Sequence, residues 1–202
     1  MIIVDCEQGS DEWFKARMGV PSASNFSKIC TTLGKWSASA DAYINELASE
    51  VITGQRSQGF TNDAMQRGID LEPQARKNFE FMYDHKVEEI GFCIHEELGV
   101  GCSPDGLIDN FMGLEIKCPL AHTHLSYLKK GMLPSKYIQQ VQGSLLVTER
   151  GCWHFYSYHP DFGEQLMITV QRDEKFIELL SGHLKRATDE VGECVEKFKK
   201  GE

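Results

Sequence analysis

The sequence lacks the long apolar run of ~20 residues that a membrane-spanning helix requires. Its first residues, MIIVDCEQGSDEW, contain no basic segment followed by an apolar run, so we expect no secretory signal. Internal repeats, low-complexity tracts and long linkers are also missing. These absences predict a cytoplasmic protein with no membrane segment, and one domain over residues 1–202.

Cysteine pairs at metal-binding spacing are also absent. The seven cysteines are scattered, odd in number and contain no CxxC pair. We therefore expect free thiols, mostly as small buried residues, and no iron–sulfur cluster. One alternative stays open, because Cys118, His122 and His124 are zinc-type ligands, although no second ligand pair at zinc-finger spacing accompanies them.

A basic excess, typical of proteins that coat nucleic acid, is absent too, since the net charge is −9. The charges are nevertheless unevenly distributed. Acidic residues predominate over 63–115, whereas the only acid of 117–150 is Glu149 and the bases there are Lys117, Lys129, Lys130, Lys136 and Arg150. This order is expected where carboxylates bind cations and nearby lysines meet phosphates, but taken alone the lysines are better explained as a solvated helix face.

The periodicity of apolar residues predicts a mixed α/β fold. Helices are expected from Ser10, from Ser22 as cap to Cys30, over 39–53, over 62–83 with a weakened or kinked middle at Gly68 and Pro73, from Pro134 as first helical residue and from Asp173. Short apolar runs punctuated by Gly, Pro and Asp-Asn predict strands at 86–96, 99–103, 107–108, 114–118, 152–158 and 165–171.

The strongest chemical signal is the segment CSPDGLIDNFMGLEIKCP, residues 102–119. Strand alternation puts Glu115 and Lys117 on one face while Ile116 points into the core, and a hairpin-like return brings Asp105 beside them. Two carboxylates and an ammonium are costly to bury without a partner. A divalent cation resolves that cost, and Mg²⁺ prefers carboxylate, carbonyl and water ligands, with a substrate phosphate completing its shell.

Such a cluster suits phosphodiester hydrolysis, which requires on the order of 20 kcal/mol of barrier reduction. Metal ions activate water, hold the phosphoryl oxygens and stabilise the leaving oxyanion, while a lysine beside them orients or deprotonates the attacking water. The alternative is a surface salt bridge between Glu115 and Lys117. SPDG followed by GLEIKCP favours a Mg²⁺-dependent deoxyribonuclease instead.

Pro104-Asp105 with Glu115-Ile116-Lys117 resembles the PD-(D/E)xK nuclease signature, and the wider sequence resembles lambda-type phage exonucleases, the YqaJ-like viral recombinases. The resemblance runs from about residue 7 to residue 174 and rests on five blocks in the right order: DEWFKARMGVPSAS, RGIDLEPQAR, CSPDGL, GLEIKCP and YIQQVQ. It implies a restriction-endonuclease-like core, in which helices flank a central mixed sheet.

The resemblance also implies a metal site for Mg²⁺, with two ions expected and Mn²⁺ as a substitute. Its implied ligands are Glu72 from a helix, Asp105 as the bridging acid, Glu115, and the backbone carbonyl of Ile116. For Glu72 the alternative is an ordinary exposed helical glutamate.

Further residues near the metal site receive roles by the same resemblance. Lys117 would handle the nucleophilic water, and Gln140, in the YIQQVQ helix, would support the site. Tyr137 is a weaker candidate. An amide on this largely apolar helix has an alternative role, which is to satisfy a backbone group.

Arg17, Ser24 and Ser103 match the family's pocket for a 5′-terminal phosphate. A guanidinium and two hydroxyls suit phosphate recognition on chemical grounds as well. The alternatives are a surface helical arginine and an ordinary polar serine. Met65 precedes Glu72 by two helical turns, so we hypothesise that it wedges into the duplex end, although core packing is the commoner role of methionine.

The resemblance finally implies a 5′-to-3′ exonuclease that digests duplex DNA, releases mononucleotides and leaves 3′ single strands. A ring-shaped homotrimer, a single-strand annealing protein as partner, and phage or prophage origin in a bacterial host go with it. The segment after Ser24 is shorter than in lambda-type enzymes and has only Lys28 and Lys35 as bases. Two alternatives remain, a structure-specific or restriction-type endonuclease and a non-catalytic DNA-binding subunit.

Overall fold

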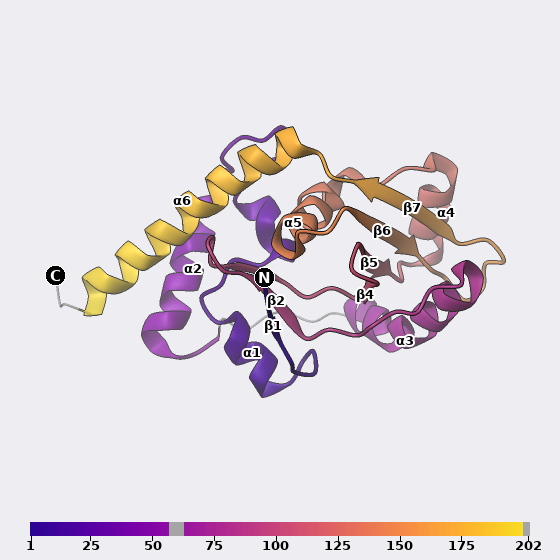
Figure 1. Cartoon of the computed structure of the whole chain (residues 1–202), viewed down its shortest axis with the longest axis horizontal. Coiled ribbons are helices and arrows are strands. Elements are labelled where there is room, and N and C mark those ends of the chain that lie inside the picture. The colour runs from indigo at the N-terminus through magenta and orange to yellow at the C-terminus, as the bar shows by residue number, and fades with distance from the viewer. Residues whose placement is uncertain (57–62, 200–202) are drawn as a thin grey trace.

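Two sheets form the framework of the chain, for which a computed structural model describes residues 1–56 and 63–199 (Figure 1). The smaller sheet is antiparallel and has the order β1 (Ile2–Val4), β2 (Phe92–His95), β3 (Val100–Cys102). The larger has the order β4 (Gly106–Ile108), β5 (Met112–Lys117), β6 (Cys152–Ser157), β7 (Leu166–Gln171). In this sheet β5 and β6 run parallel, whereas the β4–β5 and β6–β7 pairs are antiparallel, so the predicted mixed sheet is confirmed.

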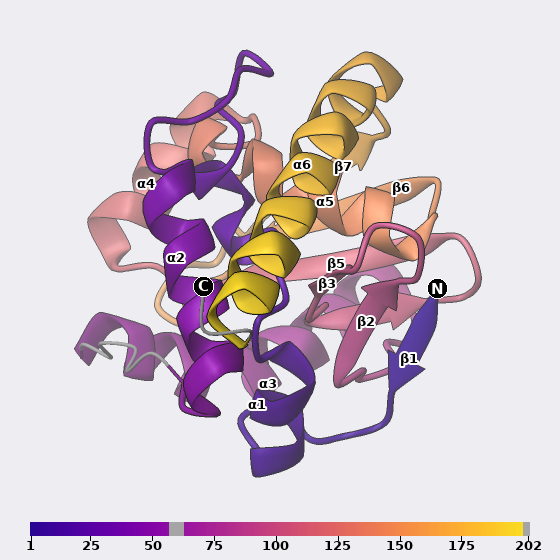
Figure 2. The same cartoon turned by 90° about the vertical axis from the view of Figure 1, so that its left-hand side faces the viewer.

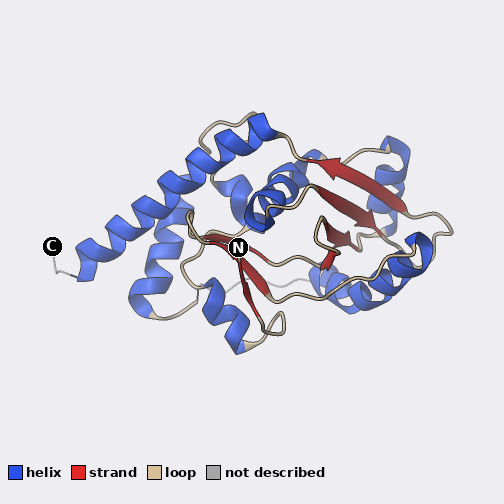
Figure 3. Ribbon diagram, viewed as in Figure 1, coloured by secondary structure: helices blue, strands red, loops and turns tan. Residues whose placement is uncertain are grey.

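Helices flank both sheets (Figure 3). They are α1 (Asp11–Arg17), α2 (Ala40–Thr53), α3 (Asp63–Tyr83), α4 (Ala121–Lys130), α5 (Ile138–Thr148) and α6 (Glu174–Lys199), with 3₁₀ turns η1 (Ala23–Lys28) and η2 (Ser135–Tyr137). The predicted starts of two helices are confirmed. Ser10 Oγ accepts a bond from Trp13 N at 3.2 Å, and Asp173 Oδ1 accepts one from Phe176 N at 3.1 Å, which satisfies amides that a helix start leaves without partners.

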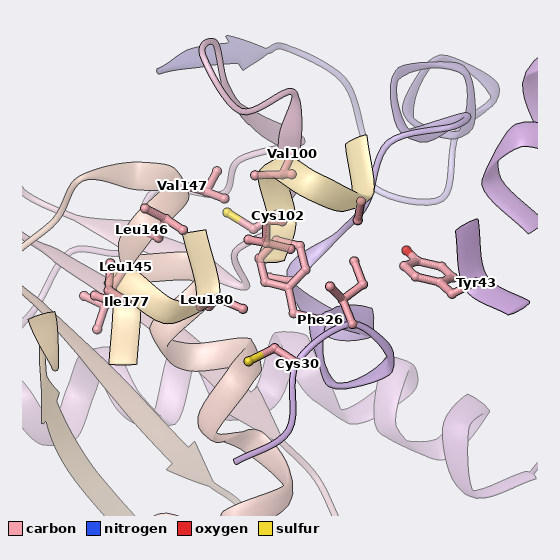
Figure 4. Packing of buried hydrophobic residues seen from close by; sticks show 14 of the residues in the cluster. Phe26, Cys30, Tyr43, Val100, Cys102, Leu145, Leu146, Val147, Ile177 and Leu180 are labelled. Carbon is pink, nitrogen blue, oxygen red and sulfur yellow. The ribbon is translucent and has the colours of Figure 1, made fainter. Parts of the chain in front are cut away.

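Helix α5 is central, because it packs against both sheets, η1 and α6. The larger buried cluster surrounds it, and Figure 4 shows Leu145, Phe26 and Leu180 meeting there. A Cβ on Gly143 would lie 2.3 Å from the Phe26 ring, so glycine is required for this close approach. Helix α6 lies across α2 and contributes residues to this cluster (Figure 2).

A second buried cluster fills the space between α3 and the larger sheet. Leu114 and Ile116 of β5 pack there against Phe79 of α3. Because side chains alternate along a strand, Glu115 and Lys117 face the opposite side of the sheet. The two clusters therefore fix which face of β5 carries the charged residues.

The structure corrects several boundaries. β1 and α4 were not predicted, and only Phe92–His95 of 86–96 forms a strand, Glu88 making an isolated bridge to Leu107. η1 ends at Lys28, and the Ser22 side chain makes no cap hydrogen bond because its hydroxyl accepts from Arg17. Helix α3 runs through Gly68 and Pro73 without interruption. Position 62, the predicted start of that helix, lies outside the described residues.

All seven cysteines are free and five are buried, as predicted. In the described part of the chain, no helix combines the length and the apolar character of a membrane span.

Candidate active site

Glu115 and Lys117 lie on one face of β5, as strand alternation predicts. Glu115 is 1% exposed, and its Oε1 pairs with the Lys117 ammonium. Gln140 of α5 donates from Nε2 to the same Oε1 at 2.7 Å. The Lys117 ammonium also lies 5.5 Å from the centre of the Tyr137 ring. Residues from β5, α5 and η2 thus meet around one carboxylate.

Asp105 joins this group through the backbone of β5. The pairing of β4 with β5 ends at Gly106 and Leu114, and Asp105 N still donates to Leu114 O at 3.2 Å. The Asp105 carboxylate then accepts from Ile116 N at 2.6 Å and takes the place of the next ladder partner. In such a ladder the N–H and C=O of one residue point to the same edge, so the Ile116 carbonyl points to the edge where Asp105 lies.

Glu72 approaches the same edge from α3. It lines a surface pocket of about 540 Å³ together with Asp105, Ile116 and Lys117. Its Oε1 accepts from Arg76 Nη2 at 2.6 Å. The four ligands proposed from sequence, with Lys117, therefore border one pocket or support its wall.

Burial raises the pKa values of the three acids of this site, and repulsion between the acids raises those of Glu72 and Glu115 further. Burial raises the pKa of Glu115 to about 7, with repulsion from Asp105 and Glu72 adding to it. Burial and the neighbouring Asp105 likewise raise the pKa of Glu72 to about 7, and burial raises the pKa of Asp105. The carboxylates Glu115 and Asp105 raise the pKa of the Lys117 ammonium against the effect of its burial. Concentrated negative charge of this kind favours cation binding.

The oxygen ligands of this site are of the kinds that Mg²⁺ prefers. Among the described residues no three His, Cys, Asp or Glu side chains converge closely enough to hold one ion. Mg²⁺ usually takes only one or two protein carboxylates and keeps several waters, so Asp105, Glu115 and the Ile116 carbonyl suffice as a starting set. The same observation gives no support to the zinc alternative. His124 instead bonds Ser157 Oγ at 2.8 Å and Glu164 O at 3.2 Å.

The residues predicted for a phosphate pocket converge as well. Arg17 donates from Nη1 to Ser103 Oγ at 3.0 Å and from Nη2 to Ser22 Oγ at 3.3 Å. Ser24 Oγ lies 3.4 Å from Ser22 Oγ. Arg17, Ser22 and Ser24 line a surface pocket of about 520 Å³. Charged side chains of both signs also line this pocket: Lys28, Arg56, Glu46 and Glu50. The Arg17 guanidinium beside serine hydroxyls is the part that matches a phosphate in chemistry.

Met65 borders both pockets. It lines the one that contains Arg17 and the one that contains Glu72. Its side chain is 53% exposed, so ordinary core packing does not describe it. This position is compatible with contact to DNA that spans the two pockets.

Three residues near these pockets were missed in the sequence. Trp13 donates from Nε1 to Ser103 Oγ at 2.8 Å, and its ring lies 4.1 Å from the Arg17 guanidinium. The sequence suggests a role for Ser22 only as a helix cap, and for Arg76 only as part of a block that matches the family. Trp13 and Arg17 are one helical turn apart, which was the available signal for a stacked pair.

Comparison with known proteins places these features in a class and then in a family. The mixed sheet with flanking helices is the restriction-endonuclease-like core of PD-(D/E)xK nucleases, as predicted. The profile of the YqaJ-like viral recombinase domain matches residues 12–151. The chain belongs to this family, which confirms the resemblance found in the sequence.

Similar solved structures support a nuclease. The alkaline exonuclease LHK-Exo from Laribacter hongkongensis is 32% identical with a TM-score of 0.86, over 95% of this chain and 97% of that one. A structure of LHK-Exo in complex with dAMP gives the same values. A phage related exonuclease from Haemophilus somnus 129PT, 15% identical over 89% of this chain and 96% of its own, shares the fold with a TM-score of 0.70. The comparison with curated proteins returned no significant match.

Proposed function

We propose that the protein is a Mg²⁺-dependent 5′-to-3′ exonuclease that digests linear duplex DNA from a 5′-phosphate. It would release mononucleotides and leave 3′ single strands for recombination by single-strand annealing. The exonuclease relatives and the family support a nuclease. The polarity, the metal dependence and the substrate end are proposed from the resemblance stated for the sequence, and the contacts of the matching residues support them.

The observation that carries this proposal is the short link between the two sites. Ser103 Oγ accepts a hydrogen bond from Arg17, and Asp105 belongs to the carboxylate site. Two residues of chain span at most about 7 Å, which is the scale of a single nucleotide. A terminal phosphate held by Arg17 would therefore place the next phosphodiester beside the carboxylates, and hydrolysis there releases one nucleotide.

Each residue has a defined task in this proposal. Glu72, Asp105, Glu115 and the Ile116 carbonyl would hold Mg²⁺ as ligands shared over two ions, because no three acids among the described residues converge on one point, and Mn²⁺ would be a substitute. The bound metal would supply charge stabilisation and an activated water. Lys117 would orient that water, and Gln140 would keep the Glu115 carboxylate aligned through its 2.7 Å bond. Arg17, Ser24 and Ser103 would bind the terminal phosphate.

The biological setting is proposed along with the reaction. The chain would act as one nuclease domain over residues 1–202, in a homotrimeric ring around DNA, and cooperate with a single-strand annealing protein. It would work in the cytoplasm of a bacterial host, encoded by a phage or prophage. Membership of the YqaJ-like viral recombinase family supports the phage origin and a role in recombination. The ring, the annealing partner and the compartment are proposed from the resemblance stated for the sequence.

The deciding experiment is digestion in Mg²⁺ of linear duplex DNA with and without a 5′-phosphate, beside supercoiled circles. We expect faster loss of the phosphorylated duplex, intact circles and no digestion by Lys117→Ala. An exposed exchange such as Lys185→Ala on α6 is the matched control and should digest normally.

Other outcomes would replace the proposal. Cutting of the circles would mean an endonuclease on the same core. DNA binding without any digestion would mean a non-catalytic subunit. Equal digestion of both linear duplexes would contradict recognition of the 5′-phosphate, whereas the proposed metal site would stand.

A further inference from the structure

Arg76 of α3 makes three contacts that link separate parts of the active site. Its Nη2 donates to Glu72 Oε1 at 2.6 Å, within the same helix. Its Nε donates to the Asp105 backbone carbonyl at 3.0 Å, across to the turn between β3 and β4. Its Nη1 lies 2.8 Å from Glu89 Oε2. One side chain therefore touches two of the proposed metal-binding residues and a third acid outside the site.

Burial separates this arrangement from an ordinary helix-surface ion pair. The side chain of Arg76 is only 11% exposed, whereas that of Glu89 is 72% exposed. A solvent-exposed pair four residues apart contributes little and needs no third partner. Here the guanidinium of Arg76 contacts three partners, so the direction of its N–H donors is fixed.

The geometry of the fork matters for the carboxylates. A guanidinium presents several N–H donors in one rigid plane, whereas an ammonium is a single charge on a flexible stem. Arg76 engages Oε1 of Glu72, and among the described residues no hydrogen bond reaches the second oxygen, Oε2. That leaves one oxygen of the carboxylate directed by the protein and the other for a cation.

We propose that Arg76 is the positioning residue of the metal site, holding Glu72 at a fixed distance from the Asp105 turn. It acts through these residues and does not touch substrate. Residues that orient metal ligands typically influence metal affinity by about 10- to 100-fold. This inference rests on the proposed function, because it assumes that Glu72 and Asp105 bind the metal.

The test is metal binding by the full chain without DNA, read as the loss of the free Mn²⁺ signal in electron paramagnetic resonance. Arg76→Lys keeps the positive charge and removes the fork, and Arg76→Gln removes both. We expect Mn²⁺ affinity to fall at least about tenfold in Arg76→Lys and further in Arg76→Gln. Digestion assays should show a matching rise in the Mg²⁺ concentration for half-maximal rate, with a smaller change in rate at saturating Mg²⁺.

Two controls separate positioning from general stability. Arg186→Lys makes the same exchange on α6, where Arg186 pairs with Glu190, and should bind Mn²⁺ like the wild type. Glu89→Gln removes only the negative charge of the exposed partner and should alter affinity less than about twofold. Melting temperatures show whether each variant is folded at the assay temperature.

The outcomes are distinct. Wild-type Mn²⁺ affinity in folded Arg76→Lys and Arg76→Gln would overturn the positioning role and leave the proposed function intact. Absence of Mn²⁺ binding and of digestion in the wild type would overturn the proposed function and this inference together.

Discussion

The carboxylate site and the Arg17 pocket are two polar regions that suit ligands of opposite charge. The first gathers Glu72, Asp105 and Glu115 against one ammonium, and burial with mutual repulsion raises the pKa of these acids. In the second, the Arg17 guanidinium donates hydrogen bonds to the neutral hydroxyls of Ser22 and Ser103. One region therefore attracts a cation and the other an anion.

The difference explains how one small fold handles a charged polymer. A phosphodiester substrate brings anions, and its cleavage needs cations beside the scissile bond. The two regions are joined by Ser103 and Asp105 within one short segment, and Met65 borders both pockets. Changes confined to one region should therefore impair one task and spare the other.

The largest expected effect comes from Glu115→Gln, which removes a charge with little change in shape. Loss of metal-based charge stabilisation of about 4 kcal/mol would slow digestion by roughly 10³-fold. Addition of Mg²⁺ at about 100 times its dissociation constant should raise the melting temperature of the wild type by about 5–10 °C. The variant should lose both the digestion activity and the Mg²⁺-dependent rise in melting temperature. A variant that stays active would show that Glu115 is not a metal ligand.

A smaller and more selective effect is expected from Arg17→Ala. Charge-assisted hydrogen bonds contribute about 1.5–3 kcal/mol, so the rate on 5′-phosphorylated ends should fall roughly 10- to 100-fold. The rate on 5′-hydroxyl ends should hardly change. Rates measured on the two substrates with the same enzyme provide the internal control. An equal loss on both would show that Arg17 supports the fold and not phosphate recognition.

Met65→Ala should give a still smaller effect that depends on both regions. Separation of one base step costs a few kcal/mol, and a single side chain supplies part of it, so digestion of a blunt duplex should slow about fivefold. A duplex with a frayed 5′ end should be digested at the normal rate. Unchanged digestion of the blunt duplex relative to the frayed one would contradict the wedge hypothesis.

The smallest expected effect lies outside both regions, whose pocket linings contain no histidine. Burial lowers the pKa of His154, and repulsion from His85 lowers it further; burial also lowers the pKa of His124. The unfolded chain thus binds more protons below a pH of about 6.5, so the free energy of unfolding falls as the pH decreases. Urea unfolding at about pH 7.5 and about pH 5.5 should show a smaller difference for His154→Gln than for the wild type.

The carboxylate site was more predictable from sequence than the phosphate pocket. Glu115, Ile116 and Lys117 follow the alternation of one strand, so their faces could be assigned from spacing alone. The contact of Trp13 with Ser103 joins α1 to the segment after β3, and the contact of Arg17 with Ser22 depends on the turn after α1, so no helix or strand periodicity reveals either. Arg17, Ser24 and Ser103 were identified only through the family resemblance.

There are also physical reasons why the sequence did not predict β1, α4 and the contacts of Arg76. β1 has three residues at a sheet edge, with Ile2 and Ile3 exposed, so it shows no alternation. α4 buries only His124 and Tyr127, which is too little apolar periodicity to mark a helix. Arg76 sits four residues after Glu72, where an ordinary helix-surface pair looks the same in sequence.

The bond from Ile116 N to the Asp105 carboxylate also bears on solubility. In the part of the chain that the structure describes, no strand pairs with β5 on the β4 side beyond Leu114, and unpaired strand edges are templates for aggregation. Asp105 occupies one amide of that edge, and Arg67 occupies the carbonyls of Cys118 and Pro119 at 3.0 and 3.1 Å. Truncation of Asp105 to alanine would expose this edge, so an inactive form made that way would be prone to self-association, whereas Asp105→Asn would keep the edge covered.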